Sequence, residues 1–214
     1  DVKNLGILGF GGEHVRATES LSLYRVFRLE PLGSRARHTA ASPGLVMQPS
    51  LARQLGRAHR QSLAPAQRAV FNQQIQHQVA QLTGRIATYW ALPEEADPGR
   101  KPGQYLPVIQ GASLVFARYQ SDQQCQPGAL KIPVPIDAEC LSVDQMDWVL
   151  VPLTAFDGRG NRVGMGGGFY DQTLSAIPRS RRIGIAYAGQ DAGAIEAQAW
   201  DIPLGHVITP TGWR

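Results

Sequence analysis

The segment WVLVPLTAFDGRGNRVGMGGGFYDQTL, Trp148–Leu174, says most about the architecture of this chain. It begins with an almost continuous apolar run, which is typical of a strand buried on both faces of a sheet. Four glycines within the five positions from Gly164 to Gly168 then lead into a helical pattern near Phe169. This order of strand, loop and helix places the glycines where an open α/β sheet binds its ligands, beyond the carboxyl end of a strand.

The glycine run matches neither of two common nucleotide-binding loops. A P-loop needs a lysine followed by Ser or Thr, and the dinucleotide fingerprint needs the spacing GxGxxG. Two interpretations stay open: a structural turn, or a cradle whose backbone N–H groups approach a phosphate. Arg162 would add a forked donor to such a phosphate. Asp171, in the first turn of the helix, would either interact with the helix dipole or ligate Mg2+ beside the phosphate.

Helical and strand patterns surround this segment. Residues 51–63 and 65–82 predict two helices, the second with apolar side chains at helical spacing: Val70, Phe71, Ile75, Val79 and Leu82. Short apolar runs rich in β-formers follow at IATYWAL, YLPVI, SLVFARY and RIGIAYA, and further helical patterns at GFYDQTLSAI and AGAIEAQAW. The sequence therefore predicts an α/β protein with one sheet between helices.

The first 48 residues differ from the rest, because they show no sustained helical or strand period. We predict that residues 1–48 are a disordered extension, or a non-native one upstream of a natural start at Met47. Residues 49–214 have the length expected of a single catalytic domain.

Composition argues against several classes of function. Hydrophobic residues make up 43% and charged residues 18%, as in an ordinary soluble protein. The net charge of +4 forms no basic stripe with interleaved aromatics, so we expect no nucleic-acid partner. No apolar run approaches the ~18 residues that span a bilayer. Cys125 and Cys140 lack metal or redox spacing, which indicates free thiols in a reducing compartment. We expect a cytoplasmic monomer.

From Leu51 to the C-terminus, the chain resembles the 5-formyltetrahydrofolate cyclo-ligase (methenyltetrahydrofolate synthetase) family. The most specific match is the block R-x-G-x-G-x-G-[FY]-[FY]-D at Arg162–Asp171, preceded by VPLTAFD. IGIAYAGQ and WDIPLGHVIT also match, and the arginine-rich first helix, YWALPEE and YLPVI match more weakly. The resemblance implies a three-layer α/β fold with an open, mostly parallel sheet of the NagB/RpiA/CoA-transferase type.

The resemblance implies an enzyme that uses ATP and Mg2+ to convert 5-formyltetrahydrofolate into 5,10-methenyltetrahydrofolate, with release of ADP and phosphate. The formyl oxygen would attack the γ-phosphate, and a folate nitrogen would then close the ring as phosphate leaves. Such chemistry depends on positioning and charge neutralisation more than on an acid–base pair. The alternatives are a catalytically weakened folate- or nucleotide-binding paralogue and, on fold analogy alone, an enzyme for sugar phosphates or CoA.

The resemblance also implies roles for individual positions. ATP is expected at Arg53, Arg57, Arg162, Gly164, Gly166, Gly167 and Gly168. The reduced folate is expected at Tyr89, Trp90, Glu95, Met165 and Phe169. Mg2+ is expected at Asp171 and Asp201, and the expected catalytic residues are Arg162 and Tyr170.

Each of these roles has a structural alternative. Arg53 and Arg57 would also suit a solvated helix face, and Asp201 would suit a turn before Pro203. The aromatic residues would suit a core. Glu94 adjoins Glu95, so an alignment slip of one residue would exchange their roles.

The segment between Glu95 and Tyr105 departs from the family pattern. A helix of the family is replaced by a shorter stretch with two prolines and two glycines, EADPGRKPGQY. Val134, in LKIPVP, also stands where the family often has an acidic residue. We expect a missing helix to uncover part of the sheet and to shift Glu95, so folate binding is where any defect should appear.

Overall fold

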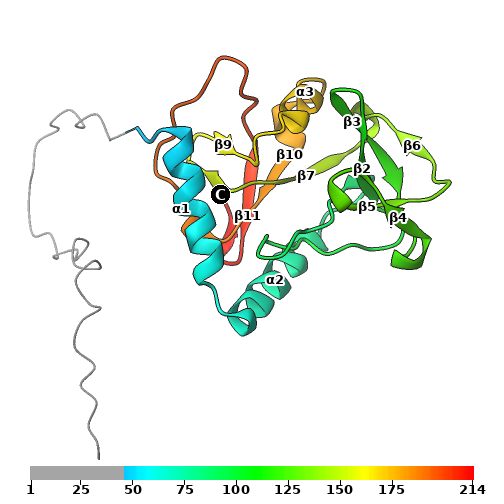
Figure 1. The fold of residues 1–214 in the computed structure, drawn as a ribbon, viewed down its shortest axis with the longest axis horizontal. Coiled ribbons are helices and arrows are strands. Elements are labelled where there is room, and N and C mark those ends of the chain that lie inside the picture. Colours follow the sequence, from blue (N-terminus) through cyan, green and yellow to red (C-terminus); the bar gives the residue numbers. More distant parts are fainter. Residues whose placement is uncertain (1–45) are drawn as a thin grey trace, which may run out of the picture. The chain divides into compact units, whose positions relative to one another are not determined.

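An eight-stranded sheet forms the centre of this computed structural model, which describes residues 46–214 (Figure 1). The strand order is β12-β11-β10-β7-β1-β2-β3-β6. The strands are β1 Ile86–Ala87, β2 Tyr105–Gln110, β3 Ser113–Arg118, β6 Cys140–Leu141, β7 Trp148–Pro152, β10 Arg182–Ile185, β11 His206–Thr209 and β12 Gly212–Trp213. The strands from β11 to β2 are parallel, and β12, β3 and β6 add antiparallel edges. The predicted mostly parallel sheet is confirmed.

Two small hairpin sheets and five short 3-10 turns complete the secondary structure of the described residues. The first hairpin pairs β4 Cys125–Pro127 with β5 Pro133–Pro135, and the second pairs β8 Ala155–Phe156 with β9 Arg162–Val163. The 3-10 turns are η1 Asp122–Gln124, η2 Ala129–Lys131, η3 Val143–Gln145, η4 Arg179–Arg181 and η5 Ala188–Gln190. The β8–β9 hairpin carries the chain from the end of β7 into the glycine loop.

Helices cover both faces of the sheet. In β7, Val149 packs in one apolar cluster with Leu174 of α3 (Phe169–Leu174), whereas Leu150 packs in a second cluster with Ile75 and Val79 of α2 (Pro65–Val79). Successive side chains of a strand point to opposite faces, so α3 and α2 lie on opposite faces. The apolar run that opens the diagnostic segment is therefore buried on both sides, as predicted.

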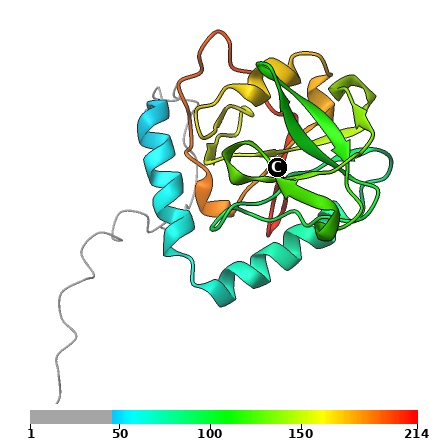
Figure 2. The ribbon, with the colours of Figure 1, turned by 45° about the vertical axis from the view of Figure 1, so that its right-hand side comes forward.

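The helix α1 (Pro49–Ser62) meets α2 at an angle, with only two residues between them (Figure 2). Pro65 opens α2 at a position whose N–H has no partner inside the helix. Gly56 lets α1 approach the chain after β7, because a Cβ there would lie 2.0 Å from the Thr154 carbonyl oxygen. Both predicted N-terminal helices are confirmed, although Val70 is 51% exposed rather than buried.

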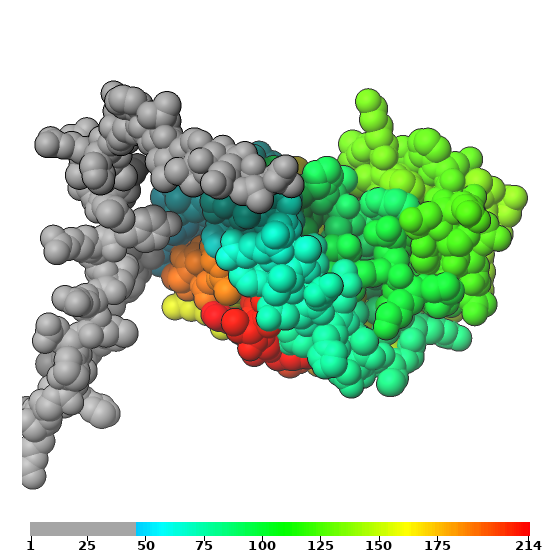
Figure 3. Space-filling view, turned by 90° about the horizontal axis from the view of Figure 1, so that it is seen from below, coloured from blue at the N-terminus to red at the C-terminus, as the bar shows by residue number. Residues whose placement is uncertain are grey.

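The C-terminal strands lie beside α2. In the view from below, the end of the chain appears next to this helix (Figure 3), and Gln78 donates to the Thr209 carbonyl at 2.7 Å. Cys125 and Cys140 are free, as predicted. No helix between residues 46 and 214 has both the length and the apolar character needed to cross a membrane. The extension predicted for residues 1–48 falls, except for its last three residues, outside the described part of the chain.

The helix predicted at AGAIEAQAW is wrong, because residues 191–205 form an irregular loop. Its backbone groups are bonded to distant partners instead of to each other. Met47 donates to the Ala194 carbonyl and accepts from Glu196 N, at 2.8 and 2.9 Å. The Asp157 carboxylate accepts from Ile195 N at 3.0 Å. These bonds to distant segments outweigh the helix propensity of the local sequence.

Candidate functional site

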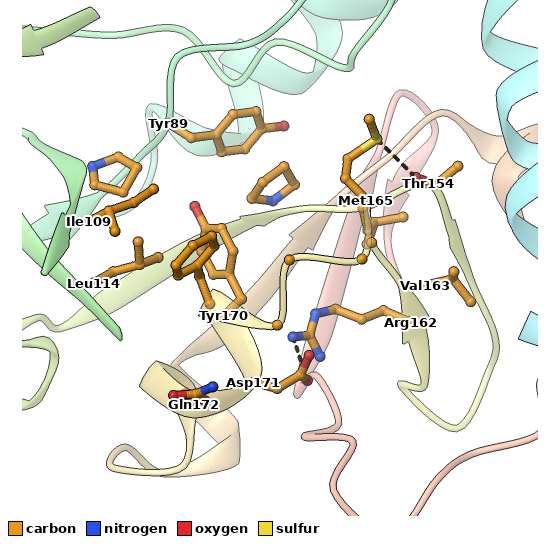
Figure 4. A pocket seen from close by; sticks show the side chains of 18 of the residues that line it. Tyr89, Ile109, Leu114, Thr154, Arg162, Val163, Met165, Tyr170, Asp171 and Gln172 are labelled. Carbon is orange, nitrogen blue, oxygen red and sulfur yellow. Dashed lines mark hydrogen bonds and ion pairs between the residues drawn. The ribbon is translucent and has the colours of Figure 1, made fainter. Parts of the chain in front are cut away.

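A cavity of about 1090 Å3 opens beyond the carboxyl ends of β7 and β1 (Figure 4). Its walls are α1, the segment after β1, the β2–β3 hairpin, the glycine loop and the loop of residues 195–202. This is the place at which the sequence predicts a ligand site. The cavity is large enough for a drug-sized ligand and more.

Nearly all of the predicted site residues line this cavity. They are Arg53, Tyr89, Trp90, Glu95, Arg162, Gly164, Met165, Gly166, Gly167, Gly168, Phe169, Tyr170, Asp171 and Asp201. Arg57 does not line the cavity, but its Nη2 lies 3.5 Å from Met165 Sδ. Positions that are far apart in the sequence are therefore brought together around one space.

The glycine loop turns its backbone toward open space. Gly166 and Gly168 have φ values of 102° and 70°, which favour glycine. A Cβ added at Gly164, Gly166 or Gly168 would meet no atom within 4 Å. Arg53 Nε donates to the Gly164 carbonyl at 2.9 Å, so Arg53 ties the loop to α1 instead of facing only solvent. The loop therefore has room beside its backbone for a ligand, and it lines the cavity.

Arg162 and Asp171 form an ion pair at one end of the cavity. Arg162 Nη2 donates to Asp171 Oδ1 at 2.8 Å, and Nη1 donates to the Ile202 carbonyl at 2.6 Å. The Arg162 side chain is only 4% exposed, whereas Asp171 is 31% exposed. Ile202 N also donates to Asp171 Oδ1, at 3.3 Å. Arg162 therefore fixes Asp171 and the loop that carries Asp201.

Three arginines bind three consecutive carbonyls of that loop. Besides the Arg162 bond to Ile202, Arg182 Nη1 donates to Pro203 at 3.1 Å and Arg179 Nε donates to Leu204 at 2.7 Å. Burial lowers the pKa of Arg182, and the neighbouring charges of Arg162 and Arg179 lower it further. The clasp, as we call these three arginines, holds the backbone that follows Asp201.

Asp171 and Asp201 suit a Mg2+ ion. Asp171 Oδ1 and Asp201 Oδ2 accept hydrogen bonds, the second from Gln198 N at 2.8 Å, but the other oxygen of each carboxylate accepts none from residues 46–214. In that part of the chain no group of three or more acidic, His or Cys side chains could hold a metal. One or two carboxylates are what Mg2+ takes when phosphates and waters complete its shell.

Glu95 lines the cavity from the wall formed by the segment after β1. Its carboxylate accepts from Arg60 Nη1 at 3.4 Å and from Leu92 N at 3.0 Å, and the Arg60–Glu95 pair is buried. Glu94 is not among the lining residues, so of the two adjacent glutamates Glu95 is the one that can face a ligand in this cavity. The cavity that the arginines and glycines line therefore also contains a buried carboxylate.

The segment after Glu95 has no helix, as predicted, yet Glu95 is well anchored. The Tyr187 hydroxyl donates to the Glu95 carbonyl at 3.1 Å, and Asn72 of α2 accepts from Asp97 N at 3.1 Å. These bonds fasten residues 95–97 to α2 and to Tyr187, which lies between β10 and η5. Glu95 therefore lines the cavity without that helix, and a shift relative to its position in the family stays a prediction.

The Tyr170 hydroxyl is buried and has no hydrogen-bond partner among residues 46–214. Its ring lies between Leu114 and Arg162, with the hydroxyl pointing toward the Tyr89 side of the cavity (Figure 4). Burial raises the pKa of Tyr170 far above its ordinary value, the Glu95 charge raises it further, and Arg162 lowers it. Tyr170 therefore stays protonated and can donate to a ligand.

Several lining residues were not predicted. Ile109 and Leu114 are paired across β2 and β3 near their turn, Leu130 lies in η2, and Trp200 lies in the 195–202 loop. No local pattern distinguishes the first three from core or surface positions. The position of Trp200 directly before Asp201 could have indicated that it lies near the site. Arg60 also continues the arginine stripe of α1, although its pairing with Glu95 needs the fold.

Comparisons with known proteins identify the family of this chain. The model of the "5-formyltetrahydrofolate cyclo-ligase family" matches residues 45–210. The 5-formyltetrahydrofolate cyclo-ligase of Escherichia coli K12 is 37% identical over 114 residues, which are 50% of this chain and 63% of that protein. The same-named protein of Haemophilus influenzae is 36% identical over 115 residues, 49% and 59% of the two chains. These alignments span less than two thirds of the curated relatives.

Solved structures show the same fold. The NMR structure of Aquifex aeolicus 5,10-methenyltetrahydrofolate synthetase has a TM-score of 0.67 and 25% identity, over 78% of this chain and 91% of that one. The Mycoplasma pneumoniae 5,10-methenyltetrahydrofolate synthetase has a TM-score of 0.60 and 24% identity, over 77% and 99%. Because the family model covers most of the chain, including the whole described sheet except its last strand, this chain belongs to the 5-formyltetrahydrofolate cyclo-ligase family.

Proposed function

We propose that this chain is an ATP- and Mg2+-dependent enzyme that converts 5-formyltetrahydrofolate into 5,10-methenyltetrahydrofolate and releases ADP and phosphate. One observation carries the proposal: a single cavity joins the open glycine loop and the Asp171–Asp201 carboxylates to the wall that holds Glu95. A phosphoryl transfer between two substrates needs both of them in one space. The family to which the chain belongs supports the same reaction.

The glycine end of the cavity would hold ATP. A Cβ at Gly164, Gly166 or Gly168 would meet no protein atom within 4 Å, so these glycines leave room for a phosphate to approach the backbone N–H groups. Arg53 positions the loop through the Gly164 carbonyl and adds positive charge beside it. Asp171 and Asp201 would hold Mg2+ through their free oxygens. When bound, Mg2+ would neutralise charge on the phosphates during transfer.

The opposite end would hold the reduced folate. The Glu95 carboxylate would accept hydrogen bonds from the pterin ring, with Arg60 and Leu92 N fixing its orientation. The surrounding side chains are aromatic or aliphatic and would contact the flat faces of the ligand: Tyr89, Trp90, Ile109, Leu114 and Phe169. Met165 lies toward α1, near Arg57 and Thr154, where it would separate the two substrates.

The chemistry takes place between the two ends. The formyl oxygen of the folate attacks the γ-phosphorus, so an O–P bond forms while the bond to the leaving ADP oxygen breaks. The neighbouring folate nitrogen then attacks the formyl carbon, and the C–O bond breaks as phosphate leaves. Tyr170, which remains protonated, would donate a hydrogen bond to the formyl or phosphate oxygen. Arg162 would act by holding Asp171 in place, since its guanidinium is almost wholly buried.

Turnover by the purified full chain tests the proposal. Formation of the methenyl product, followed by its absorbance, should require ATP, Mg2+ and 5-formyltetrahydrofolate together, and one ADP should appear per product. Glu95→Gln should raise the KM for the folate and leave the KM for ATP nearly unchanged. Binding of ATP and folate without product would instead identify a weakened paralogue. Glu95 is anchored in the cavity, which favours the active enzyme.

The remaining features of the proposal concern the molecule as a whole. Both substrates are small molecules, so we propose a cytoplasmic monomer that needs no macromolecular partner. Light scattering of the eluted protein would test the monomer. The relation to folds of the NagB/RpiA/CoA-transferase type stays a prediction from the resemblance.

A further inference from the structure

Trp200 is a large, exposed aromatic side chain that lines the cavity. Its residue is 70% exposed, and it stands in the irregular loop between Gln198 and Asp201, both of which also line the cavity. A tryptophan exposes a broad apolar ring that stacks favourably on other rings. At the edge of a ligand cavity, this ring is available to stack on a ring of the bound ligand.

The surroundings of Trp200 suit a nucleotide. Asp201, its neighbour in the chain, is one of the two carboxylates that suit Mg2+. Arg53 and Arg57 stand on the α1 side and have no carboxylate partner within residues 46–214. Unpaired guanidinium groups, open glycine amides and an acidic metal site together favour an anionic ligand with phosphates.

The other aromatic residues of the cavity are placed elsewhere. Tyr89 and Trp90 follow β1, and Phe169 and Tyr170 begin α3; of these, Tyr89 and Trp90 stand on the same segment as Glu95. Among the described lining residues, Trp200 is thus the aromatic side chain that the 195–202 wall contributes. A ligand ring bound near Asp201 could therefore stack on no other aromatic side chain of that wall.

We propose that Trp200 stacks on the purine base of the nucleotide and forms the base subsite of the cavity. This proposal rests on the proposed function, which makes ATP a substrate. It adds the residue that contacts the base of ATP. Stacking recognises the flat face of a base and not its hydrogen-bonding edge. ATP and GTP should therefore bind with similar affinity, while CTP, whose ring is smaller, should bind more weakly.

Calorimetry with the full chain and Mg2+ tests the subsite by comparing ATP with inorganic tripolyphosphate. Trp200→Ala should weaken ATP binding on the order of tenfold and leave tripolyphosphate binding unchanged, because only ATP has a base to stack. Trp200→Phe should restore most of the affinity. Trp213→Ala is the matched control, since Trp213 is 44% exposed but does not line the cavity.

The outcomes separate the subsite from the proposed function. Equal losses for ATP and tripolyphosphate, or unchanged ATP affinity in Trp200→Ala, would overturn the subsite. Weaker binding of 5-formyltetrahydrofolate with unchanged ATP binding would also overturn it and would assign Trp200 to the folate tail. A wild-type chain that binds ATP through Trp200 but makes no methenyl product would overturn the proposed function alone. A wild-type chain that binds no ATP would overturn both.

Discussion

The Arg162 guanidinium connects Asp171, at 2.8 Å, to the Ile202 carbonyl, at 2.6 Å. Asp171 follows the glycine loop, whereas Ile202 follows Asp201, so one buried arginine sets the relative position of two carboxylates that are thirty residues apart. Metal ligands need such supporting contacts, because small shifts weaken a metal site. The motif arginine would therefore support the proposed metal site by holding Asp171 and the loop after Asp201.

Replacing either carboxylate should reduce Mg2+-dependent activity, but with different effects on stability. Asp171→Asn leaves the Arg162 charge unpaired and should lower the free energy of unfolding by about 1–2 kcal/mol, a value reduced because Asp171 is 31% exposed. Asp201→Asn keeps an acceptor for Gln198 N and should change stability by less than about 0.5 kcal/mol. Activity should fall at least ~10-fold in both. Urea unfolding and Mg2+ titrations measure the two effects. Full activity in Asp201→Asn would show that Asp201 is not a metal ligand.

A single methyl group at Gly164 should block ATP without harming the fold. A Cβ there meets no protein atom within 4 Å and the residue has no positive φ, so Gly164→Ala should melt like the wild type. The same methyl group would project toward the phosphates and should raise the KM for ATP about tenfold or more. Gly158→Ala is the matched control, because Gly158 is equally unobstructed but does not line the cavity. Unchanged ATP affinity in Gly164→Ala would leave the loop a structural turn.

Tyr170→Phe should reduce kcat while leaving the thermal stability equal to that of the wild type or slightly higher. The hydroxyl is buried without a partner among the described residues, and such a group costs about 1–3 kcal/mol when it is unsatisfied. Because burial raises the pKa of Tyr170, no step in kcat from this tyrosine should appear between roughly pH 6 and 9. Differential scanning calorimetry and pH profiles check both points. A marked loss of stability, with kcat retained, would make Tyr170 a structural residue.

Tyr187→Phe should make the protein less sensitive to alkaline pH. Burial raises the pKa of Tyr187 to about 12, against about 10 for a free tyrosine. Below pH ~10 the hydroxyl is protonated in both states, and its stabilising effect is fully present. As the pH rises from 10 toward 12 only the unfolded state ionises, so stability is lost. Urea unfolding at several pH values should show a shallower decline in the variant. If the free energy of unfolding fell equally steeply with pH in both proteins, Tyr187 would not be the source of the alkaline sensitivity.

The same substitution should loosen the folate end of the cavity. The Tyr187 hydroxyl contacts Asn72 Oδ1 at 2.9 Å and the Glu95 carbonyl at 3.1 Å. Its loss should lower the free energy of unfolding at neutral pH by about 1–3 kcal/mol and raise the KM for 5-formyltetrahydrofolate. The KM for ATP should stay unchanged, because the glycine loop is held by Arg53. Steady-state kinetics with each substrate varied in turn provide the comparison.

The residues that could be predicted from the sequence are those whose signal is local. Arg162–Asp171 is one contiguous block, and its glycines, arginine and carboxylate belong to one strand, loop and helix. The strand β7 could be predicted because its burial on two faces requires a continuous apolar run. The same reasoning failed for AGAIEAQAW, whose backbone bonds to Met47 and Asp157 do not appear in its composition.

Contacts between distant segments could not be predicted. Arg60 and Glu95 belong to α1 and to the loop after β1, and only the fold pairs them. The missing helix after Glu95 suggested a displaced carboxylate, but bonds from Tyr187, after β10, and to Asn72, in α2, hold residues 95–97. Ile109 and Leu114 likewise enter the cavity through the pairing register of β2 with β3. Side-chain partners of this kind depend on topology and not on local propensity.

Substitutions in the arginine clasp should weaken the metal site from a distance. Arg182 and Arg179 donate to the Pro203 and Leu204 carbonyls, so they hold the backbone after Asp201 without contacting a ligand. Arg179→Gln should raise the Mg2+ concentration needed for half-maximal activity about tenfold, with an unchanged KM for 5-formyltetrahydrofolate. Arg179→Lys should recover part of this loss, since lysine can still donate to Leu204. Arg181→Gln is the control, because Arg181 is a half-buried arginine next to the clasp that donates to the Asp144 and Met146 carbonyls. If Arg179→Gln changes stability and both substrate KM values together but not the Mg2+ requirement, the clasp supports the fold in general and not the position of Asp201.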